Sequence, residues 1–443
     1  MINFFYKIYG IIILCFLMVN SQAQSTKILT LDDAVKIGIE NSKQLKLSLS
    51  KASLADERYQ DYESTVFPSI KASAGYTRLS PIDPFSFLMP GAKEPITLFP
   101  VFLNSYTSQL SIYEPFYNGL RAKYTFQSQK FLLLAAKFDV ENDRNEVVFN
   151  IINAYFNIYK ISKSLAILDR NIEEIKEHIK ETEDYEKQGL AIHNDVLKVQ
   201  LQLSNAEFTK LDLQTSYDVA SYNYSILLGL DTKTKISIDT AQTFSVKQTK
   251  SLDDYLKDAM NNRNDIKAFD NRNKSFEANE LVTKGAYLPT VGVGGDFYFS
   301  NPNSRVIPPN DVFKATWDAG IYISYDVSSL YTNKHKVAQS KIITEQNKDT
   351  YDILVDNIKS EVNQNFMAYR EATQKIELSN KTILQAEENY RTIHSRYSNH
   401  IALLSDVLDA NISLLQAKMN LELANADSEI AYYKLMKSTG NTK

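Results

Sequence analysis

Apolar residues recur at alternating steps of three and four along four long stretches of this chain. The first stretch places them at Ile151, Ala154, Ile158, Ile161, Leu165, Leu168, Ile172, Ile175 and Ile179. The same spacing runs through 196–227, interrupted only at Lys210, and through 376–397 and 407–435. A heptad stripe of this length is typical of α-helices that pack side by side along their whole length. The sequence therefore predicts long coiled-coil helices and not a single globular core.

The positions of glycine and proline show where these helices stop. Most of the 13 Gly and 11 Pro lie in two windows, 68–119 and 285–320. Leu120–Gln188 contains neither residue. Since Gly and Pro are the main interruptions of helices, this stretch predicts one helix of about 100 Å, at about 1.5 Å per residue. Shorter helices are expected near 32–66 and 194–228.

The two windows rich in Gly and Pro show a period of two instead. Apolar residues alternate with small or polar ones in the segments 70–77, 106–113, 291–299 and 317–326. This alternation, with aromatic residues near the ends, is typical of strands in a transmembrane barrel with a polar lumen. A soluble hairpin with one buried face would give the same pattern in any single segment. The matched set of four strands, together with an export signal, favours the membrane interpretation.

The N-terminus has the pattern of a secretory signal peptide over residues 1–23. Lys7 supplies the positive start, Ile11–Val19 is a short apolar core, and Ser21–Ala23 is a small-x-small cleavage site. The apolar core is far shorter than the roughly 20 residues of a membrane-spanning helix. The only cysteine, Cys15, lies inside this segment, so a mature chain without cysteine is expected. No later stretch suits a spanning helix, so any membrane contact is expected to use strands.

The chain contains an internal duplication. Leu31–Asp33 corresponds to Leu252–Asp254, and Asn41 to Asn262, at an offset of 221, whereas Gly229 corresponds to Gly440 at an offset of 211. The change of offset falls in loops between strands, where insertions are tolerated. The predicted organisation is a signal peptide at 1–23, a first repeat at 24–230 (helix, β-hairpin 67–117, helical hairpin 119–228), a linker at 231–250, and a second repeat at 251–443 (helix, β-hairpin 287–327, helical hairpin 330–438). Four strands cannot close a barrel, for which about eight are needed, so this organisation predicts an oligomer.

These features together resemble the TolC-like outer membrane efflux proteins over essentially the whole mature chain. The most specific motif is the start of each return helix, Asp195-Val196-Leu197 and Asp406-Val407-Leu408. The resemblance implies an α+β fold in which three chains form a 12-stranded β-barrel in the outer membrane and a helical α-barrel in the periplasm. It further implies a homotrimer that contacts outer membrane lipid, a periplasmic adaptor (membrane fusion protein) and an inner-membrane RND or ABC transporter. The implied function is passive conduction in an efflux pump or a type I secretion system.

The resemblance also implies an entrance gate. In this family, paired aspartates of the second return helix form the constriction at the periplasmic entrance, and they map to Asp406 and Asp409. Three chains would place six carboxylates around one opening, which favours cations. Tyr397 matches a tyrosine that helps to hold the entrance shut. The alternative is that Asp406 is the N-cap of its helix and Asp409 a solvated acid of the first turn. The first repeat has Asp195 but Lys198, so the acidic pair occurs once per chain.

The turns of the two helical hairpins are candidates for adaptor contact, with plain tight turns as the alternative. Ala402 stands where the family has an arginine that helps to close the entrance, and His400 stands where the first turn has glycine. A histidine tolerates the left-handed conformation less easily than glycine does. The candidate residues are Gly189, Leu190, Ala191, Ile192, His400, Ile401, Ala402 and Leu403.

Two other classes of protein are possible interpretations. A periplasmic structural or adaptor coiled coil without a membrane barrel would explain the heptads and the signal, but not two matched hairpins. An enzyme would need a site, yet no Gly-rich phosphate loop or nucleophile elbow occurs, and no cofactor, metal or catalytic residue is expected. A net charge of −4 does not favour a nucleic-acid partner. None of the histidines pairs locally with a second ligand at metal-binding spacing; they are His178, His193, His335, His394 and His400.

Overall fold

The computed structural model describes residues 27–97, 99, 101–232, 236–240 and 247–441. The predicted signal peptide, with Cys15, lies outside these residues, and so does part of the predicted linker. Within the described ranges, no helix is both long enough and apolar enough to cross a membrane. The helices are α2 (Leu31–Asn41), α3 (Lys43–Ser64), α4 (Arg121–Lys187), α5 (His193–Leu227), α6 (Leu252–Asn262), α7 (Asn264–Gly285), α8 (Ser329–Ser398) and α9 (Leu404–Ser438). The strands are β1 (Lys27–Leu29), β2 (Ser69–Arg78), β3 (Ser86–Phe87), β4 (Ile96–Thr97), β5 (Asn104–Asn118), β6 (Ile236–Ile238), β7 (Thr290–Asn301) and β8 (Lys314–Ser324).

The chain divides into two compact units that cut across both repeats. We call them the helical unit, which contains the described residues up to Leu49, Asp139–Ile266 and Leu354 onward, and the sheet unit, which contains Ser50–Phe138 and Lys267–Ile353. Each unit takes elements from both repeats, and α3, α4, α7 and α8 have residues in both units. The units therefore do not coincide with the duplication in the sequence.

The long helices are those that the pattern predicts, with one difference. The helix expected near 120–188 is α4, of 67 residues, and the helix expected near 194–228 is α5. The helix expected near 32–66 is instead two helices, α2 and α3, which break at Ser42. The Ser42 hydroxyl accepts a hydrogen bond from the backbone N–H of Leu45 (3.1 Å) and so caps α3. A break made by a serine cap was not visible in the distribution of Gly and Pro.

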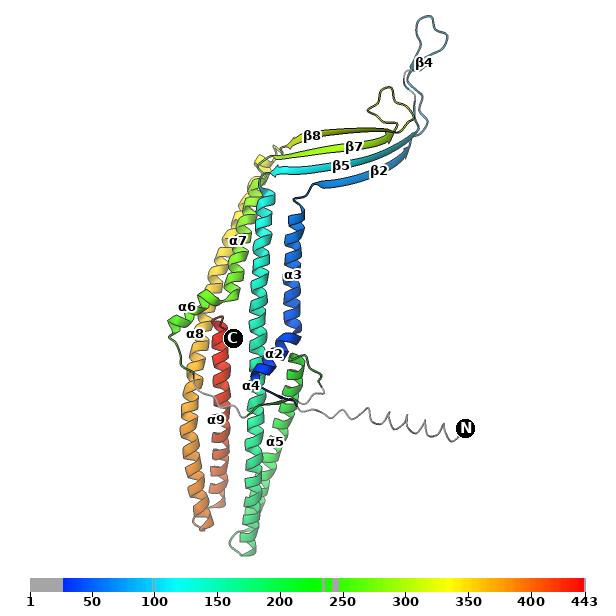
Figure 1. Cartoon of the computed structure of the whole chain (residues 1–443). Helices are drawn as coiled ribbons and strands as arrows, with labels where there is room; N and C mark the ends of the chain where they lie inside the picture. The colour runs from blue at the N-terminus through cyan, green and yellow to red at the C-terminus, as the bar shows by residue number, and fades with distance from the viewer. Residues whose placement is uncertain (1–26, 98, 100, 233–235, 241–246, 442–443) are drawn as a thin grey trace, which may run out of the picture. The chain divides into compact units, whose positions relative to one another are not determined.

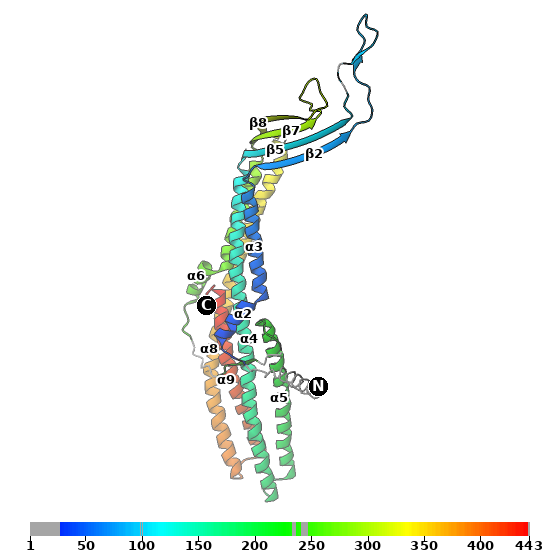
Figure 2. The same cartoon turned by 45° about the vertical axis from the view of Figure 1, so that its right-hand side comes forward.

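In the helical unit, α4, α5, α8 and α9 run side by side, and α4 contacts both α8 and α9 (Figures 1 and 2). Their heptad positions face one another, which confirms the predicted coiled-coil stripes. Near the hairpin tips the buried cluster draws on all four helices, with Leu168, Ile172, Ile175, Val199, Ala206, Tyr397, Leu404 and Val407. A second buried cluster joins α4 and α5 to the parallel pair β1–β6 and includes Ile151, Tyr155, Tyr224, Leu29 and Ile236. The core of this unit is thus a buried seam, which is the line of apolar side chains along which the helices pack.

In the sheet unit, four antiparallel strands are ordered β2–β5–β7–β8 (Figure 1). Side chains paired across neighbouring strands share one face of a sheet. One row across all four strands is Ala72, Leu110, Phe297 and Trp317, and the next row on that face is Ile70, Ile112, Gly295 and Ala319. A row on the opposite face is Ser73, Gln109, Tyr298 and Thr316. The register therefore places the predicted apolar positions of all four strands on one face, where Leu110, Phe297 and Trp317 are exposed.

The duplicated glycines lie where a helix end meets another helix. Gly229, just after α5, has a φ of 66°, and a Cβ added there would lie 2.7 Å from Cβ of Asn41. The Asn41 side chain in turn donates to the backbone carbonyl of Leu228 (3.0 Å). In the second repeat Gly440 has a φ of 74°, and a Cβ added there would lie 2.9 Å from the backbone carbonyl carbon of Asn262. Each repeat therefore brings its own matched Asn and Gly together.

Gly229→Ala is expected to destabilise the chain more than Gly189→Ala. Both glycines have a positive φ, of 66° and 71°, and a left-handed alanine costs about 1–2 kcal/mol. Only at position 229 does the new methyl group also meet a neighbour, and overpacking adds about 1–3 kcal/mol. Thermal unfolding followed by circular dichroism measures both losses. Equal losses at the two positions would show that the close contact with Asn41 contributes nothing.

Candidate functional site

The two helical hairpins end in turns of the same geometry. In the first turn the N–H of Gly189 donates to the carbonyl three residues earlier and that of Leu190 to the carbonyl five residues earlier, both at 2.9 Å. In the second turn His400 and Ile401 make the same two bonds, both at 2.8 Å. This is the hydrogen-bond pattern of a Schellman helix end, which needs one left-handed residue. Gly189 supplies it with a φ of 71° and His400 with a φ of 60°.

The His400 ring packs against α4. Its centroid lies 5.2 Å from that of Tyr185, which also lies 5.9 Å from the ring of Tyr397. Contacts between aromatic rings at these distances are favourable by about 0.5–1.5 kcal/mol. They offset part of the cost of a left-handed histidine. The second tip is therefore joined to the first through aromatic contacts that a glycine could not make.

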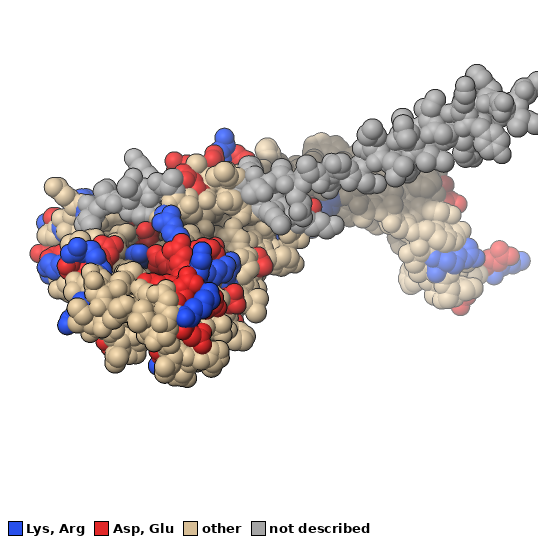
Figure 3. All heavy atoms as spheres, turned by 90° about the horizontal axis from the view of Figure 1, so that it is seen from below, with Lys and Arg blue, Asp and Glu red and all other residues tan. Residues whose placement is uncertain are grey.

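Apolar side chains project from both tips. Leu190, Ile192, Ile401 and Leu403 are each more than half exposed. Ala191 and Ala402 are partly buried, and Ala402 packs against the apolar cluster at the hairpin tips. Figure 3 looks at this end of the helical unit and shows acidic and basic side chains interleaved around uncharged surface. The predicted contact residues thus form exposed apolar points within a charged surface.

Asp406 does not cap α9 in the way the sequence suggested. The N-cap position is Leu403, and Asp406 is the third residue of the helix. Its carboxylate accepts a hydrogen bond from the backbone N–H of Leu403 (3.2 Å), which is half of a capping box. The N-cap interpretation of Asp406 is therefore wrong, because the helix begins two residues earlier, at Leu404, and its N-cap Leu403 has no side-chain acceptor. Asp406 nevertheless stabilises this helix start.

Asp409 lies one turn further along the same helix face, and both carboxylates are exposed. Within the described part of the chain, neither makes an ion pair with a basic side chain. The equivalent positions in the first repeat differ, because Lys198 Nζ lies 3.1 Å from Asp195 Oδ1 and neutralises it. The two hairpins therefore differ in net charge at these equivalent positions. Only the second hairpin has two carboxylates without a basic partner among the described residues.

Tyr397, the third predicted gate residue, is inside the subunit. It is 9 % exposed and belongs to the apolar cluster formed by α4, α5, α8 and α9. Burial raises the pKa of Tyr397. Tyr397 thus joins the end of α8 to α4 through the ring of Tyr185, and it does not share the exposed surface of the two aspartates.

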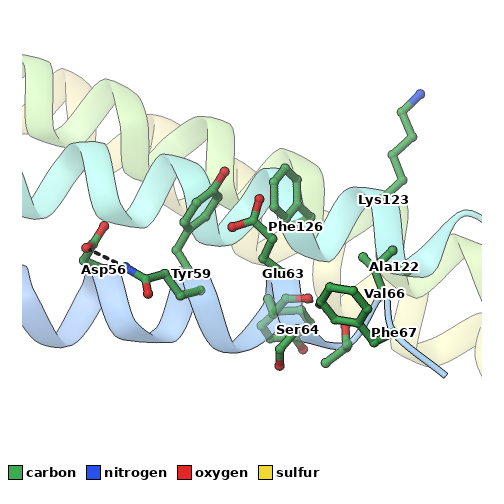
Figure 4. Close-up of a pocket in the computed structure, with 12 residues that line it drawn as sticks. Asp56, Tyr59, Glu63, Ser64, Val66, Phe67, Ala122, Lys123 and Phe126 are labelled. Carbon is green, nitrogen blue, oxygen red and sulfur yellow. Dashed lines mark hydrogen bonds between the residues drawn. The ribbon is translucent and has the colours of Figure 1, made fainter. Parts of the chain in front are cut away.

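The sheet unit contains a groove of about 910 Å³ between α3 and α4. Figure 4 shows the rings of Tyr59 and Phe126 directed toward each other across it, and their centroids lie 4.9 Å apart. Among the residues that line this groove there is no histidine, and Ser64 donates its hydroxyl to the carbonyl of Asp61 (2.6 Å). A serine bonded in this way terminates a helix and has no base to activate it. The groove offers no catalytic arrangement.

Comparisons with known proteins agree with this geometry. The family model of the outer membrane efflux proteins matches residues 255–441. The chain is related to the outer membrane efflux proteins. The matched segment contains the second hairpin tip and both aspartates of the candidate gate. No curated protein matches the chain.

Solved structures extend the likeness of the fold to both repeats. The outer membrane protein VceC of Vibrio cholerae is 15% identical, with a TM-score of 0.78 over 93% of this chain and 96% of VceC. The CmeC outer membrane channel of Campylobacter jejuni is 16% identical, with a TM-score of 0.75 over 93% and 86% of the two chains. The open MtrE outer membrane channel of Neisseria gonorrhoeae is 16% identical, with a TM-score of 0.74 over 93% and 89%. At these identities the comparisons show the fold alone.

The resemblance to the TolC-like efflux-protein family is therefore confirmed, and so is the α+β fold class with long helices. The expectation that the chain is not an enzyme is confirmed by the same family match. Sequence reasoning missed one cluster of functional groups, His178, Glu181 and His394, which the structure brings together. Its two histidines lie 216 residues apart on α4 and α8. A search for local ligand spacing could not find such a pair.

Proposed function

We propose that this chain is one subunit of an outer membrane channel that passively conducts substrates out of a Gram-negative cell. The observation that carries the proposal is the sheet unit. Its apolar face is exposed along all four strands, and burying such a face in lipid removes it from water at about 25 cal/mol per Å². The family match places the chain among efflux proteins, which agrees with an outer membrane location. A periplasmic coiled coil would have no use for this face.

The strand order supports closure by three copies. β2 and β8 are the outer strands of the four-stranded sheet, and open edges in lipid would leave backbone groups unsatisfied. Pairing of β2 in one copy with β8 in the next would satisfy both edges. Three copies would then give an even barrel of twelve strands, which is within the range of outer membrane barrels.

The helical unit supports the same assembly. On α5, exposed apolar side chains form a stripe on the side opposite the core, with Leu197, Leu201, Phe208, Leu211, Val219, Tyr222 and Ile226. On α8, Met367, Leu378 and Leu384 are also exposed. α5 and α8 are the two outer helices of the four (Figures 1 and 2). Packing of α5 from one copy against α8 of the next would bury both surfaces and continue the helical wall.

The proposed partners are inferred from the exposed side chains at the hairpin tips and from the family match. The exposed residues Leu190, Ile192, Ile401 and Leu403 would bind a periplasmic adaptor, since apolar groups at a hairpin tip are stabilised by burial in a partner. The adaptor would connect the channel to an inner-membrane RND or ABC transporter, for efflux or for type I secretion. Asp406 and Asp409 would form a ring of six carboxylates at the entrance, and Tyr397 would position α8 behind them.

Asp406→Ala combined with Asp409→Ala is expected to raise the single-channel conductance in planar bilayers and to weaken the preference for cations. The physical reason is that six carboxylates attract cations and narrow the opening. Asp195→Ala is the matched control, because Asp195 is already paired with Lys198, and it is expected to change conductance and selectivity less. A double variant that conducts with unchanged selectivity would exclude the aspartates as the gate. Absence of any conductance in the unmodified protein would exclude the channel itself.

A further inference from the structure

A group of metal-binding side chains joins the two helical hairpins above their tips. His178 and Glu181 come from α4 and His394 comes from α8, all within the helical unit. The ligand atoms of the three side chains lie within 4.8 Å of one another. His178 Nδ1 lies 3.4 Å from Glu181 Oε2, and His394 Nε2 lies 3.8 Å from the same oxygen. We propose that these three residues bind a divalent transition-metal ion such as Zn²⁺.

The distances fit such an ion. With metal–ligand bonds of about 2.0–2.2 Å and tetrahedral angles, neighbouring ligand atoms lie about 3.3 Å apart. His178 Nδ1 and Glu181 Oε2, which are 3.4 Å apart, are already close to this separation. His394 is partly exposed, with 36% of its side chain accessible, so it can rotate to shorten its separations, which are 3.8 Å from Glu181 and up to 4.8 Å from His178. Two imidazole nitrogens with one carboxylate favour Zn²⁺, Co²⁺ or Ni²⁺ over Mg²⁺ and Ca²⁺, which prefer oxygen ligands.

Two tyrosines hold the ligands in place. The hydroxyl of Tyr390 lies 2.8 Å from Nε2 of His178, and when this nitrogen donates its hydrogen to the tyrosine oxygen, Nδ1 keeps a free lone pair toward Glu181. Tyr185 donates its hydroxyl hydrogen to Oε1 of Glu181 (3.2 Å), which leaves Oε2 for the metal. Supporting contacts of this kind orient the ligands of metal sites in proteins. A chance meeting of surface side chains would lack them.

The surroundings favour a cation and allow it to enter. His178 is 7 % exposed, whereas Glu181 and His394 face solvent in part, so the ion reaches the site from their side. Glu174, one turn before His178 on α4, and Glu177, the residue next to it, add negative charge to this part of the helix. The three ligands span α4 and α8, so a bound ion connects the first hairpin to the second and opposes their separation.

The test is metal binding by the purified mature protein in detergent, carrying an affinity tag without histidines. Titration with Zn²⁺ followed by calorimetry is expected to show one ion per chain, and Co²⁺ is expected to give the visible absorption of a site with mixed nitrogen and oxygen ligands. His394→Gln and Glu181→Gln are each expected to weaken Zn²⁺ at least about 100-fold, and Tyr390→Phe about 10-fold. Zn²⁺ should also raise the unfolding temperature of the unmodified chain and not that of His394→Gln.

His193→Gln is the matched control, since His193 Nδ1 lies 3.0 Å from Glu186 Oε1 but this pair belongs to no group of three metal-binding side chains in the described part of the chain. This control variant is expected to bind Zn²⁺ with the stoichiometry and affinity of the unmodified protein. Because His178 is buried, His178→Gln could fold poorly, and the partly exposed His394 therefore decides the result. Equal Zn²⁺ affinity in His394→Gln and the unmodified protein, or no binding at submillimolar Zn²⁺, would overturn the proposal. None of these readouts depends on conduction, so they stand apart from the test of the channel.

Discussion

A chain that carries Phe208→Asp and Leu211→Asp is expected to fold and to lose its trimeric state. Both side chains lie on the exposed stripe of α5, at 68% and 63% exposure, which we assign to the contact with the next copy. Burying two large apolar side chains contributes about 3–6 kcal/mol, which corresponds to roughly a 10²–10⁴-fold change in the dissociation constant. Two carboxylates in the same interface weaken it further, because their desolvation is unfavourable.

The measurement is the molar mass of the protein in detergent by analytical ultracentrifugation. Thr209→Asp with Ser216→Asp serves as the control, since both residues are exposed and lie about a quarter turn of the helix away from the stripe. The stripe variant is expected as a monomer and the control as a trimer, both with the helix content of the unmodified protein. A stripe variant that remains a trimer would show that α5 does not form the subunit contact.

Ala72→Arg is expected to prevent assembly into the outer membrane, whereas Ser73→Arg is expected to be tolerated. The two residues are neighbours on β2 and both are exposed. Ala72 belongs to the row that contains Leu110, Phe297 and Trp317, and Ser73 belongs to the polar face. An arginine facing lipid near the middle of the bilayer costs about 2–4 kcal/mol, and one facing a wet lumen costs little.

The proposed assembly of three copies would contain three such arginines, so the unfavourable free energy of placing arginine in lipid would apply three times. The amount of heat-modifiable protein in isolated outer membranes measures the effect. Ala72→Arg should reduce this amount by at least about tenfold, since 1.4 kcal/mol already corresponds to a factor of ten. If both variants assemble equally well, the apolar face does not meet lipid and the sheet has another role.

The helices and the faces of the strands could be predicted because both leave local periodic patterns in the sequence. The three- and four-residue steps on α4 and α9 mark the buried seam, and Leu168, Ile172, Val407 and Leu414 are indeed buried. The break at Ser42 left no such pattern, because it depends on one hydroxyl that caps α3. Helix interruptions made by capping side chains are harder to predict than those made by Gly or Pro.

A second break, between α6 and α7, depends on contacts far away in the chain. The guanidinium of Arg263 lies 2.7 Å from Asp265 and 2.7 Å from Glu361 on α8, and it donates to the carbonyl of Ser438 (3.0 Å). Ion pairs with two carboxylates stabilise this half-buried cation at the point where α6 ends. Nothing near position 263 in the sequence predicts a partner 98 residues away.

The candidate site could be predicted only in part. The paired aspartates were proposed from the resemblance to the efflux-protein family and the tips from the two predicted turns, but the environment of each residue could not be predicted. The alternative interpretation of Asp406 as an N-cap depended on the preference for aspartate at that position, yet α9 begins after Leu403 and has Asp406 at its third position. The cluster of His178, Glu181 and His394 was missed because helix packing, and not spacing in the sequence, brings its members together.

The account depends most on closure of one wall by three copies of this chain. Electron cryomicroscopy of the mature protein extracted from outer membranes tests this closure directly. We expect three copies around one axis, with β2 of each copy paired to β8 of the next and α5 packed against the neighbouring α8. A single chain, or an assembly in which the outer edges of β2 and β8 remain unpaired, would contradict the account.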